Sequence, residues 1–298
     1  MGKNNIRWIA RQGLYLTFAL FFPYQAFPDT LEVRYWGGTP GRVEYELEVL
    51  REALDAASDA PYTVQHNVQS YGSDRGRQEI ALGDRVNVYA SAYQHDALVT
   101  TGQLIPVERP LLKGLLGYRS LIVRKQDLAK FAAMTRLSDL QQVVVGQGSG
   151  WFDAQVYRHN GIEVDESARF RLLLGMLSHK RFDTVILGVM EAAPTLAGSQ
   201  YADELSVVPG LGVYYPHPLI YYVSANAPQL AERLQRGMDL LQANGKLDML
   251  FAQHYGDLIE TMRASWQHLI ILEHPNTPLE GALDAPVFKP YIRPPSFQ

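Results

Sequence analysis

The sequence predicts an α/β fold in which mostly parallel sheets are flanked by helices. Short runs of β-branched and aromatic residues alternate along the chain with segments whose apolar residues repeat at helical spacing. Two of the predicted strands run directly into glycine-rich turns, at residues 36–41 and 146–150. This alternation indicates parallel strand pairing, with both turns at the carboxyl edge of a sheet, where open α/β sheets bind ligands.

The first glycine-rich turn follows a strand of alternating apolar and polar residues at 30–35. Trp36 and Gly37 begin the turn, and a helix is expected over residues 44–58, where leucines and alanines share one face. Two strands and a helix are expected next, at residues 62–68, 86–90 and 73–82 respectively. Trp36 and Gly37 are therefore candidate ligand contacts, although a tryptophan that only fills the protein surface explains Trp36 equally well.

The second turn follows three consecutive valines, 143–145, which are typical of a buried strand. Its glycines leave backbone N–H groups uncovered, and a short helix is expected at 154–161. The spacing matches neither the phosphate-binding loop, which continues into Gly-Lys-Ser/Thr, nor the dinucleotide-binding fingerprint. The candidate ligand contacts on this turn are Gln147, Ser149, Trp151 and Asp153. A tight connection without a ligand is the alternative, with the aspartate serving as a helix cap.

The rest of the chain continues the alternation of strands and helices. Residues 105–117 contain two prolines and two glycines and are expected to pass between two parts of the molecule. Further strands are expected at residues 119–125, 181–188 and 218–224. Further helices are expected at residues 126–131, 138–140 and 170–178, from residue 191, at 227–244 and at 246–255, the last two ended by Gly245 and Gly256. Beyond residue 272 the tail is rich in proline.

The composition, with 47% hydrophobic and 19% charged residues, is that of a globular protein. The chain of 298 residues contains no cysteine, which excludes disulfides, thiolate catalysis and cysteine-ligated metal clusters. Its formal charge of −4 argues against nucleic acid as a partner. Neither a Gly-x-Ser-x-Gly elbow nor a His-Glu-x-x-His pair occurs, so we expect no metal, no cofactor and no enzyme activity.

The first 26 residues have the pattern of a secretory signal peptide. The positive start comes from Lys3, Arg7 and Arg11. An apolar run at residues 14–22 follows, which is too short to span a bilayer, and Ala26 offers a small residue for cleavage. We therefore expect a periplasmic protein. Retention of the segment as an anchor is the alternative, because Tyr24 suits a cleavage site poorly.

Five blocks of the sequence occur in a characteristic order. They are the opening strand 31–35, the strand 117–123, the segment Leu137-Ser138-Asp139-Leu140 followed by 143–150, the strand 182–185, and the terminal helices 227–255 with Asn244-Gly245-Lys246-Leu247 at their turn. Together these blocks resemble the bacterial solute-binding proteins of family 3, which have the type II periplasmic-binding fold. The resemblance extends over residues 29–260.

This resemblance implies a two-lobed periplasmic-binding-protein-like type II fold, in which each lobe is a mostly parallel sheet flanked by helices. The implied division is a signal peptide at 1–26, a first lobe at 27–115 and 224–272, a second lobe at 116–223, and a proline-rich tail at 273–298. In such proteins the ligand lies between the lobes, at loops that follow strands.

Amino-acid-binding members of the family carry a Thr-x-x-Arg segment after the third strand, and its arginine binds the ligand carboxylate. Here Tyr93, Gln94 and His95 stand in that region, without an arginine. Gly188 stands where those members have an aspartate for the ligand ammonium, and Glu191 is the nearest carboxylate. These departures argue against a simple α-amino acid as the ligand. His95 also fits as a surface or hinge residue.

Arg119 and Glu191 complete the candidate ligand contacts. Arg119 begins a strand that crosses between the lobes, and its planar guanidinium suits a carboxylate or phosphate. A salt bridge that ties the lobes together is the alternative for Arg119. Glu191 stands at the start of a predicted helix, where stabilisation of the helix dipole explains it without a ligand.

The resemblance and these candidates predict a periplasmic solute-binding protein that closes on a small polar organic ligand and delivers it to an ABC-type importer. We expect a monomer whose partner is a membrane permease or a sensor. Two alternatives stay open: a ligand-sensing subunit without a transporter, and an enzyme on the same scaffold, such as a periplasmic dehydratase. A neighbouring permease gene favours transport, whereas turnover of a candidate ligand favours the enzyme.

Overall fold

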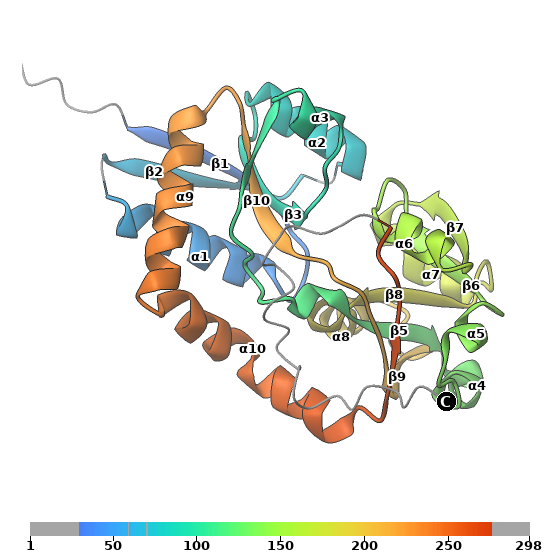
Figure 1. Ribbon diagram of the computed structural model, residues 1–298. Helices are drawn as coiled ribbons and strands as arrows, with labels where there is room; N and C mark the ends of the chain where they lie inside the picture. Colours follow the sequence, from blue (N-terminus) through green and yellow to red (C-terminus); the bar gives the residue numbers. More distant parts are fainter. Residues whose placement is uncertain (1–29, 59, 70, 276–298) are drawn as a thin grey trace, which may run out of the picture.

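The computed structural model describes residues 30–58, 60–69 and 71–275, which form two β-sheets flanked by helices (Figure 1). The first sheet contains, in spatial order, β2 (Tyr62–Asn67), β1 (Leu31–Trp36), β3 (Val88–Ala92), β10 (Leu219–Ser224) and β4 (Leu104–Val107). β1 pairs in parallel with β2 and β3, whereas β10 pairs antiparallel with β3 and β4. The predicted signal peptide, residues 1–26, and most of the predicted tail lie outside the described residues.

The second sheet contains, in spatial order, β11 (His268–Ile271), β9 (Leu205–Tyr214), β5 (Tyr118–Arg124), β8 (Thr184–Gly188), β6 (Val144–Gly148) and β7 (Glu163–Ala168). β6 pairs in parallel with β7 and β8, and β11 with β9, whereas β5 pairs antiparallel with β8 and β9. The α/β class is confirmed. Both sheets also contain antiparallel pairs. These involve β5 and β10, which arrive from the other sheet and enter in the opposite direction.

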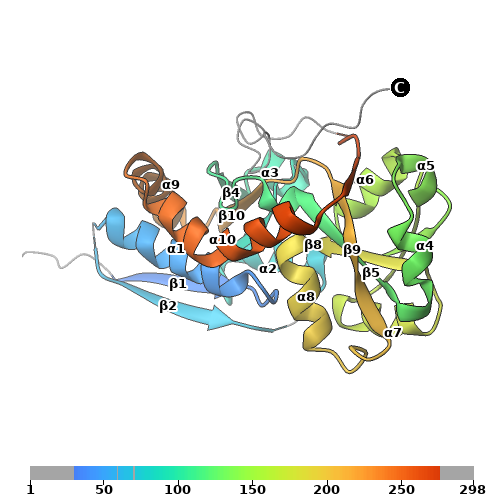
Figure 2. The same ribbon diagram turned by 90° about the horizontal axis from the view of Figure 1, so that it is seen from below.

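Helices cover both sheets. Around the first sheet lie α1 (Val43–Ala56), α2 (Ser73–Leu82), α3 (Ala97–Thr100), α9 (Pro228–Ala243) and α10 (Lys246–Ser265). Around the second lie α4 (Leu128–Ala132), α5 (Leu137–Leu140), α6 (Asp153–His159), α7 (Leu173–Ser178) and α8 (Val189–Ala197), with short 3-10 turns η1 (Leu115–Gly117), η2 (Lys125–Asp127) and η3 (Phe170–Leu172). Each sheet with its helices is one lobe, named first and second in that order. Figure 2 shows α10 running from the first lobe towards the second.

Strand pairing assigns two segments differently from the expected division. β10 pairs with strands of the first sheet, and β11 pairs with a strand of the second. The expected division places residues 219–223 in the second lobe and 268–271 in the first. The sequence signal for a crossing strand at 218–224 is real, but the chain has already crossed before β10 begins, between Tyr214 and Leu219.

Four strands lie where the sequence predicts none: β4, β7, β9 and β11. β9 contains Pro209, Gly210 and Gly212, residue types that weaken the sequence signal of a strand. Helix α10 continues past Gly256, its expected end, to Ser265. The buried Ile259 and Met262 extend its apolar stripe, and this packing outweighs the low helix propensity of glycine.

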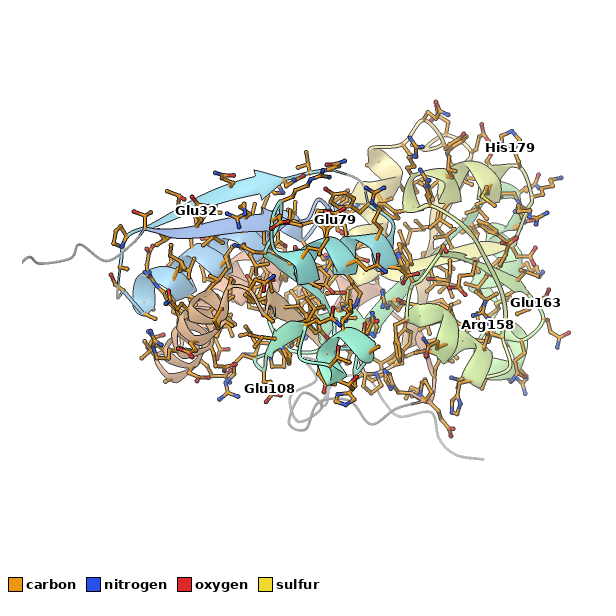
Figure 3. All side chains as sticks on the ribbon, turned by 90° about the horizontal axis from the view of Figure 1, so that it is seen from above. Glu32, Glu79, Glu108, Arg158, Glu163 and His179 are labelled. Carbon is orange, nitrogen blue, oxygen red and sulfur yellow. The ribbon has the colours of Figure 1, made fainter. Side chains whose placement is uncertain are left out.

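The apolar core of the first lobe extends to Tyr118, Val189 and Met190 of the second lobe, which also has apolar clusters of its own. In the first lobe α1 and α9 pack closely, since a Cβ added to Gly237 of α9 would lie 2.0 Å from the Ala53 carbonyl oxygen of α1. In the second lobe buried clusters cover both faces of the sheet. Charged side chains such as Glu32 and Glu163 point outward at opposite ends of the molecule (Figure 3). No helix in the described part of the chain is both long and apolar enough to cross a membrane.

Candidate ligand-binding site

A cavity of about 310 Å³ lies between the two lobes and is lined by residues of both. The first lobe contributes the loops that follow β1 and β3 and the start of α1. The second lobe contributes the start of β5, the turn between β6 and α6, and the start of α8. The carboxyl ends of parallel strands therefore converge on the cavity from both sides, which is the usual ligand position in α/β sheets.

The wall on the first lobe is aromatic. Trp36 stacks on Tyr89 with 5.6 Å between ring centroids, and it meets Tyr71 edge-on. Its indole N–H donates to the carbonyl of Gln69 at 2.9 Å. Gly76 of α2 leaves room for this ring, because a Cβ there would lie only 1.9 Å from the indole. The orientation of Trp36 is thus fixed by Tyr89, Tyr71 and Gln69.

The wall on the second lobe is the glycine-rich turn between β6 and α6. Trp151 lies over Gly148, where a Cβ would come within 2.5 Å of its ring, and it contacts Phe170 with 5.7 Å between centroids. Gly150 has a positive φ of 76°, a conformation that favours glycine. The turn therefore holds Trp151 half-buried at the cavity.

One chain of ion pairs joins the lobes across the cavity. Arg42, at the start of α1, pairs through Nη1 with Oε1 of Glu46 at 2.9 Å. Its Nε lies 2.9 Å from Oε1 of Glu191, which belongs to α8 of the second lobe. The other oxygen of Glu191 accepts the backbone N–H of Gly188 at 3.0 Å. The hydroxyl of Tyr35 donates to Glu46.

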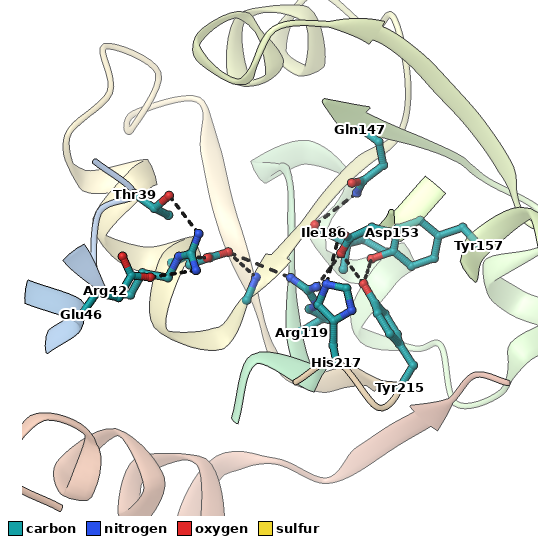
Figure 4. Close-up of polar contacts among 12 residues, drawn as sticks. Thr39, Arg42, Glu46, Arg119, Gln147, Asp153, Tyr157, Ile186, Tyr215 and His217 are labelled. Atoms are coloured by element: carbon teal, nitrogen blue, oxygen red, sulfur yellow. Dashed lines mark hydrogen bonds and ion pairs between the residues drawn. The ribbon is translucent and has the colours of Figure 1, made fainter. Parts of the chain in front are cut away.

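A second set of ion pairs lies within the second lobe and beside the segment that crosses back. Nη2 of Arg119 lies 2.5 Å from Oδ1 of Asp153, and its guanidinium lies over the ring of Tyr215, 5.1 Å from the centroid. The hydroxyl of Tyr215 also donates to Asp153. His217 places Nε2 3.7 Å from Oδ2 of the same carboxylate. Asp153 is therefore held from three directions (Figure 4).

Comparison with protein-family models finds no match for the sequence, and comparison with curated proteins finds none. Solved structures do match. An ancestral arginine-binding protein bound to arginine superposes with a TM-score of 0.54 at 15% identity, covering 77% of this chain and 100% of that one. The substrate-binding protein AbpA of Streptococcus pneumoniae, bound to L-arginine, gives 0.53 at 14% identity, covering 76% and 94%. A structure concerned with glutathione import through GshT in Streptococcus mutans gives 0.52 at 15% identity, covering 76% and 95%.

At these identities the likeness establishes the fold. The chain has the two-lobed type II periplasmic-binding-protein fold. The expectation that the family resemblance set for the architecture is therefore confirmed. The cavity of this chain lies between the lobes, a common position for a ligand site.

Burial and pairing set the charge states in this periplasmic-binding-protein cavity. Although burial favours the neutral acid, the positive charge of Arg119 holds the pKa of Asp153 below its usual value. Burial raises the pKa of Glu46, against the opposing effect of Arg42. Burial also lowers the pKa of His217 to about 3, despite the nearby Asp153, so its imidazole is neutral at neutral pH.

Seven of the predicted contact residues line the cavity: Trp36, Gly37, Gln94, Arg119, Trp151, Asp153 and Glu191. The others do not. His95 and Ser149 are exposed, whereas Tyr93 packs against an apolar cluster of the first lobe. Gln147 is fully buried within the second sheet, where its amide donates to the carbonyl of Ile186 at 3.2 Å. Ligand contact by any of the eleven predicted residues stays a prediction.

The structure also bears on the alternative interpretations of Arg119, Asp153 and Glu191. Arg119 forms a buried ion pair, but within the second lobe, and the pair that ties the lobes together uses Arg42 instead. Asp153 lies in the first turn of α6, as expected. Its carboxylate contacts Arg119, Tyr215 and His217. Glu191 lies in the first turn of α8 and accepts a backbone N–H, which matches the capping interpretation.

Sequence reasoning missed Arg42, Glu46 and His217. Arg42 directly follows the first glycine-rich turn, and Glu46 stands four residues later on the same helix face, so the spacing of an ion pair was present in the sequence. His217 lies between two prolines in the crossing segment, and nothing local marks it. In the residues that the structure describes, no three His, Asp or Glu side chains are grouped to hold a metal ion.

Proposed function

We propose that this chain is an exported solute-binding protein, a divergent member of family 3, that closes on a small polar ligand and delivers it to an ABC-type importer. The observation that carries this proposal is the cavity shared between the lobes, lined by aromatic faces and buried charges from both. A ligand held in such a cavity contacts both lobes at once. Its binding free energy therefore favours the closed arrangement over the open one.

The chain passes from one lobe to the other in three short segments, which are the proposed hinge. These are residues 108–117, 215–218 and 266–267. Short segments of this kind can absorb the change in backbone angles when two rigid lobes close on a ligand. The first two crossings lie close to cavity residues, since Arg119 and His217 line the cavity. Ligand contact and hinge closure are then coupled directly.

Export is proposed from the sequence of the first 26 residues, which lie outside the described part of the chain. A positive start and a short apolar run direct a chain to the export machinery. Fractionation followed by N-terminal sequencing tests this. A mature protein that starts near residue 27 in the periplasm supports export, and an intact N-terminus in the cytosol contradicts it.

The neighbours in fold include an ancestral arginine-binding protein bound to arginine or to glutamine and a protein of glutathione import. These neighbours support a role in solute capture. The receiver of the solute is either a permease or a sensor. A membrane permease and a sensor would both recognise the closed lobes. Loss of uptake of the bound solute when the gene is deleted favours the importer, whereas unchanged uptake with a lost transcriptional response favours the sensor.

A thermal-shift screen with amino acids, organic acids, sugars and amines tests the proposed function. A ligand at 100 times its Kd is expected to add about 2.7 kcal/mol to the free energy of unfolding. Small-angle scattering on each stabilising compound should then show a smaller radius of gyration. Stabilisation with unchanged scattering and steady turnover of the compound would instead support an enzyme on this scaffold.

A further inference from the structure

The cavity carries one more negative than positive charge. The acidic and basic side chains that line it, among the described residues, are the guanidinium groups of Arg42 and Arg119 and the carboxyl groups of Glu46, Asp153 and Glu191. Arg42 and the Tyr35 hydroxyl favour the ionised form of Glu46 against the effect of its burial. Each of the three carboxylate residues is more than nine-tenths buried. A buried carboxylate that lacks a matching cation costs free energy. A bound cation that balances the excess charge is therefore favoured over a neutral or anionic ligand.

Neither guanidinium group is free to receive a carboxylate from a ligand. Arg42 lies between Glu46 and Glu191, at 2.9 Å from an oxygen of each. Arg119 is occupied by Asp153 and covered by the ring of Tyr215. A ligand carboxylate would have to displace one of these side chains, and it would add to the excess of negative charge. The cavity thus disfavours the carboxylate of an amino acid.

His217 supplies a second, independent observation. Its side chain is only 3% exposed and lines the cavity, and Nδ1 has no hydrogen-bond partner among the described residues. A neutral imidazole carries one N–H, and the carboxylate of Asp153 near Nε2 draws the proton to that nitrogen. Nδ1 is then a buried acceptor without a donor. An N–H or O–H group of the ligand would satisfy it.

Arg119 also has a buried donor without a hydrogen-bond partner in the described part of the chain. Nε of Arg119 makes no hydrogen bond within the described residues. The charge of this guanidinium is already balanced by Asp153, so a neutral oxygen or an ordered water molecule suffices for Nε. The polar requirements of the cavity are therefore a positive charge, a donor for His217 and at most a neutral acceptor.

The aromatic walls suit the same class of ligand. Trp36 with Tyr89 on one lobe and Trp151 with Phe170 on the other all line the cavity. The negative face of an aromatic ring attracts an organic cation, and a tryptophan ring does so most strongly. Apolar carbon atoms of the ligand would gain burial against the same rings.

We propose that the cavity binds a small organic amine without a carboxylate group, whose cationic nitrogen balances the excess charge of Glu46, Asp153 and Glu191 and whose N–H or O–H donates to Nδ1 of His217. This inference rests on the proposed function and names the class of solute that the same cavity accepts. It separates this chain from a binding protein for α-amino acids.

Matched pairs of probes test the inference by isothermal titration calorimetry. Agmatine, histamine and tyramine each differ from L-arginine, L-histidine and L-tyrosine by the loss of the carboxylate. At least one amine is expected to bind ten times more tightly than its amino acid. An amino acid that binds as tightly as its amine overturns the inference, and so does the failure of every amine to bind. The proposed function survives either result if another solute class closes the lobes.

A variant of one carboxylate tests the charge itself. Glu46→Gln keeps an oxygen for the Tyr35 hydroxyl and removes the excess charge. Amine affinity is expected to fall at least tenfold, while affinity for the matching amino acid is unchanged or higher. Glu44→Gln is the control, because Glu44 lies exposed on the same helix and does not line the cavity. Equal losses for amine and amino acid in Glu46→Gln would contradict the charge argument.

Discussion

Arg42 of the first lobe and Glu191 of the second lobe form an ion pair beside the cavity, with 2.9 Å between Nε and Oε1. Gly41, which precedes Arg42, also approaches the second lobe closely. A Cβ added to Gly41 would lie 1.9 Å from the carbonyl oxygen of Met190, in the second lobe. Both contacts require that the lobes are together. Both contacts would be lost in the proposed opening of the lobes.

The close approach of Gly41 gives the first prediction. Gly41→Ala should weaken ligand binding at least tenfold, because the new methyl group meets the Met190 carbonyl and Gly41 has a positive φ of 82°. Calorimetric titration measures the loss. Gly245→Ala is the control, since Gly245 has a similar positive φ of 77°, a Cβ there meets no atom within 4 Å, and Gly245 does not line the cavity. Equal affinities of the two variants would contradict closure at this contact.

The second prediction concerns the tryptophans. Trp36 and Trp151 line the cavity, whereas Trp266 packs against Gly212 near the crossing between lobes. Ligand binding should change the intrinsic fluorescence, and Trp266→Phe should leave that change intact. Trp8, the remaining tryptophan, lies outside the described residues. A response that disappears in Trp266→Phe and persists in a Trp36→Phe and Trp151→Phe double variant would place the ligand elsewhere.

Trp151 both lines the cavity and packs against the second-lobe core, so its removal should affect two quantities. Trp151→Ala should weaken binding by fivefold or more, since a stacked ring contributes roughly 1 kcal/mol beyond its area. It should also lower the free energy of unfolding, by less than the roughly 3–5 kcal/mol of a fully buried aromatic. Unchanged affinity with a large loss of stability would assign Trp151 to the core alone.

The pair of Arg119 and Asp153 gives a stability prediction. Arg119→Met should cost roughly 3–5 kcal/mol of unfolding free energy, because it leaves the carboxylate of Asp153 buried without its cation. Adding Asp153→Asn should restore part of that loss. Arg158→Met is the control, since Arg158 is half-exposed in its pair with Glu166 and should cost under about 1 kcal/mol. Urea unfolding measures all three, and a double variant that is less stable than Arg119→Met alone would contradict direct coupling.

His217 predicts a pH dependence. Its pKa in the folded protein is about 3, below the ordinary value of 6.5, so the unfolded chain binds an additional proton between these values. Stability from this group is therefore fully present above pH 6.5 and falls as the pH drops towards 3. His217→Gln should reduce the slope by up to about 1.4 kcal/mol per pH unit in that window. A variant with the same slope as the parent protein would show that His217 is protonated when folded.

Sequence patterns predicted the fold class and part of the site because both depend on local features. The valine run before Gly146 and the alternating strand before Trp36 indicate strands, and glycine-rich turns at their ends indicate where a ligand lies. Seven predicted residues consequently line the cavity. β9 was missed because its proline and glycines contradict strand propensity, whereas pairing with β5 and β11 decides its conformation.

The partnerships inside the site depend on contacts between distant parts of the chain. Glu191 meets Arg42 only after the chain has formed both lobes, and His217 reaches Asp153 from the crossing segment. No periodicity or spacing encodes such a meeting. The charge balance of the cavity, and with it the class of ligand, therefore required the folded structure.

The most direct test of closure on a ligand measures the distance between the lobes. The chain has no cysteine, so Gln78→Cys on α2 and Gln155→Cys on α6, both exposed, accept spin labels at two defined positions. Pulsed electron spin resonance should give a broad or longer distance distribution without solute. A saturating solute from the thermal-shift screen should narrow it to one shorter distance. A solute that stabilises the protein and leaves the distribution unchanged would contradict binding between the lobes.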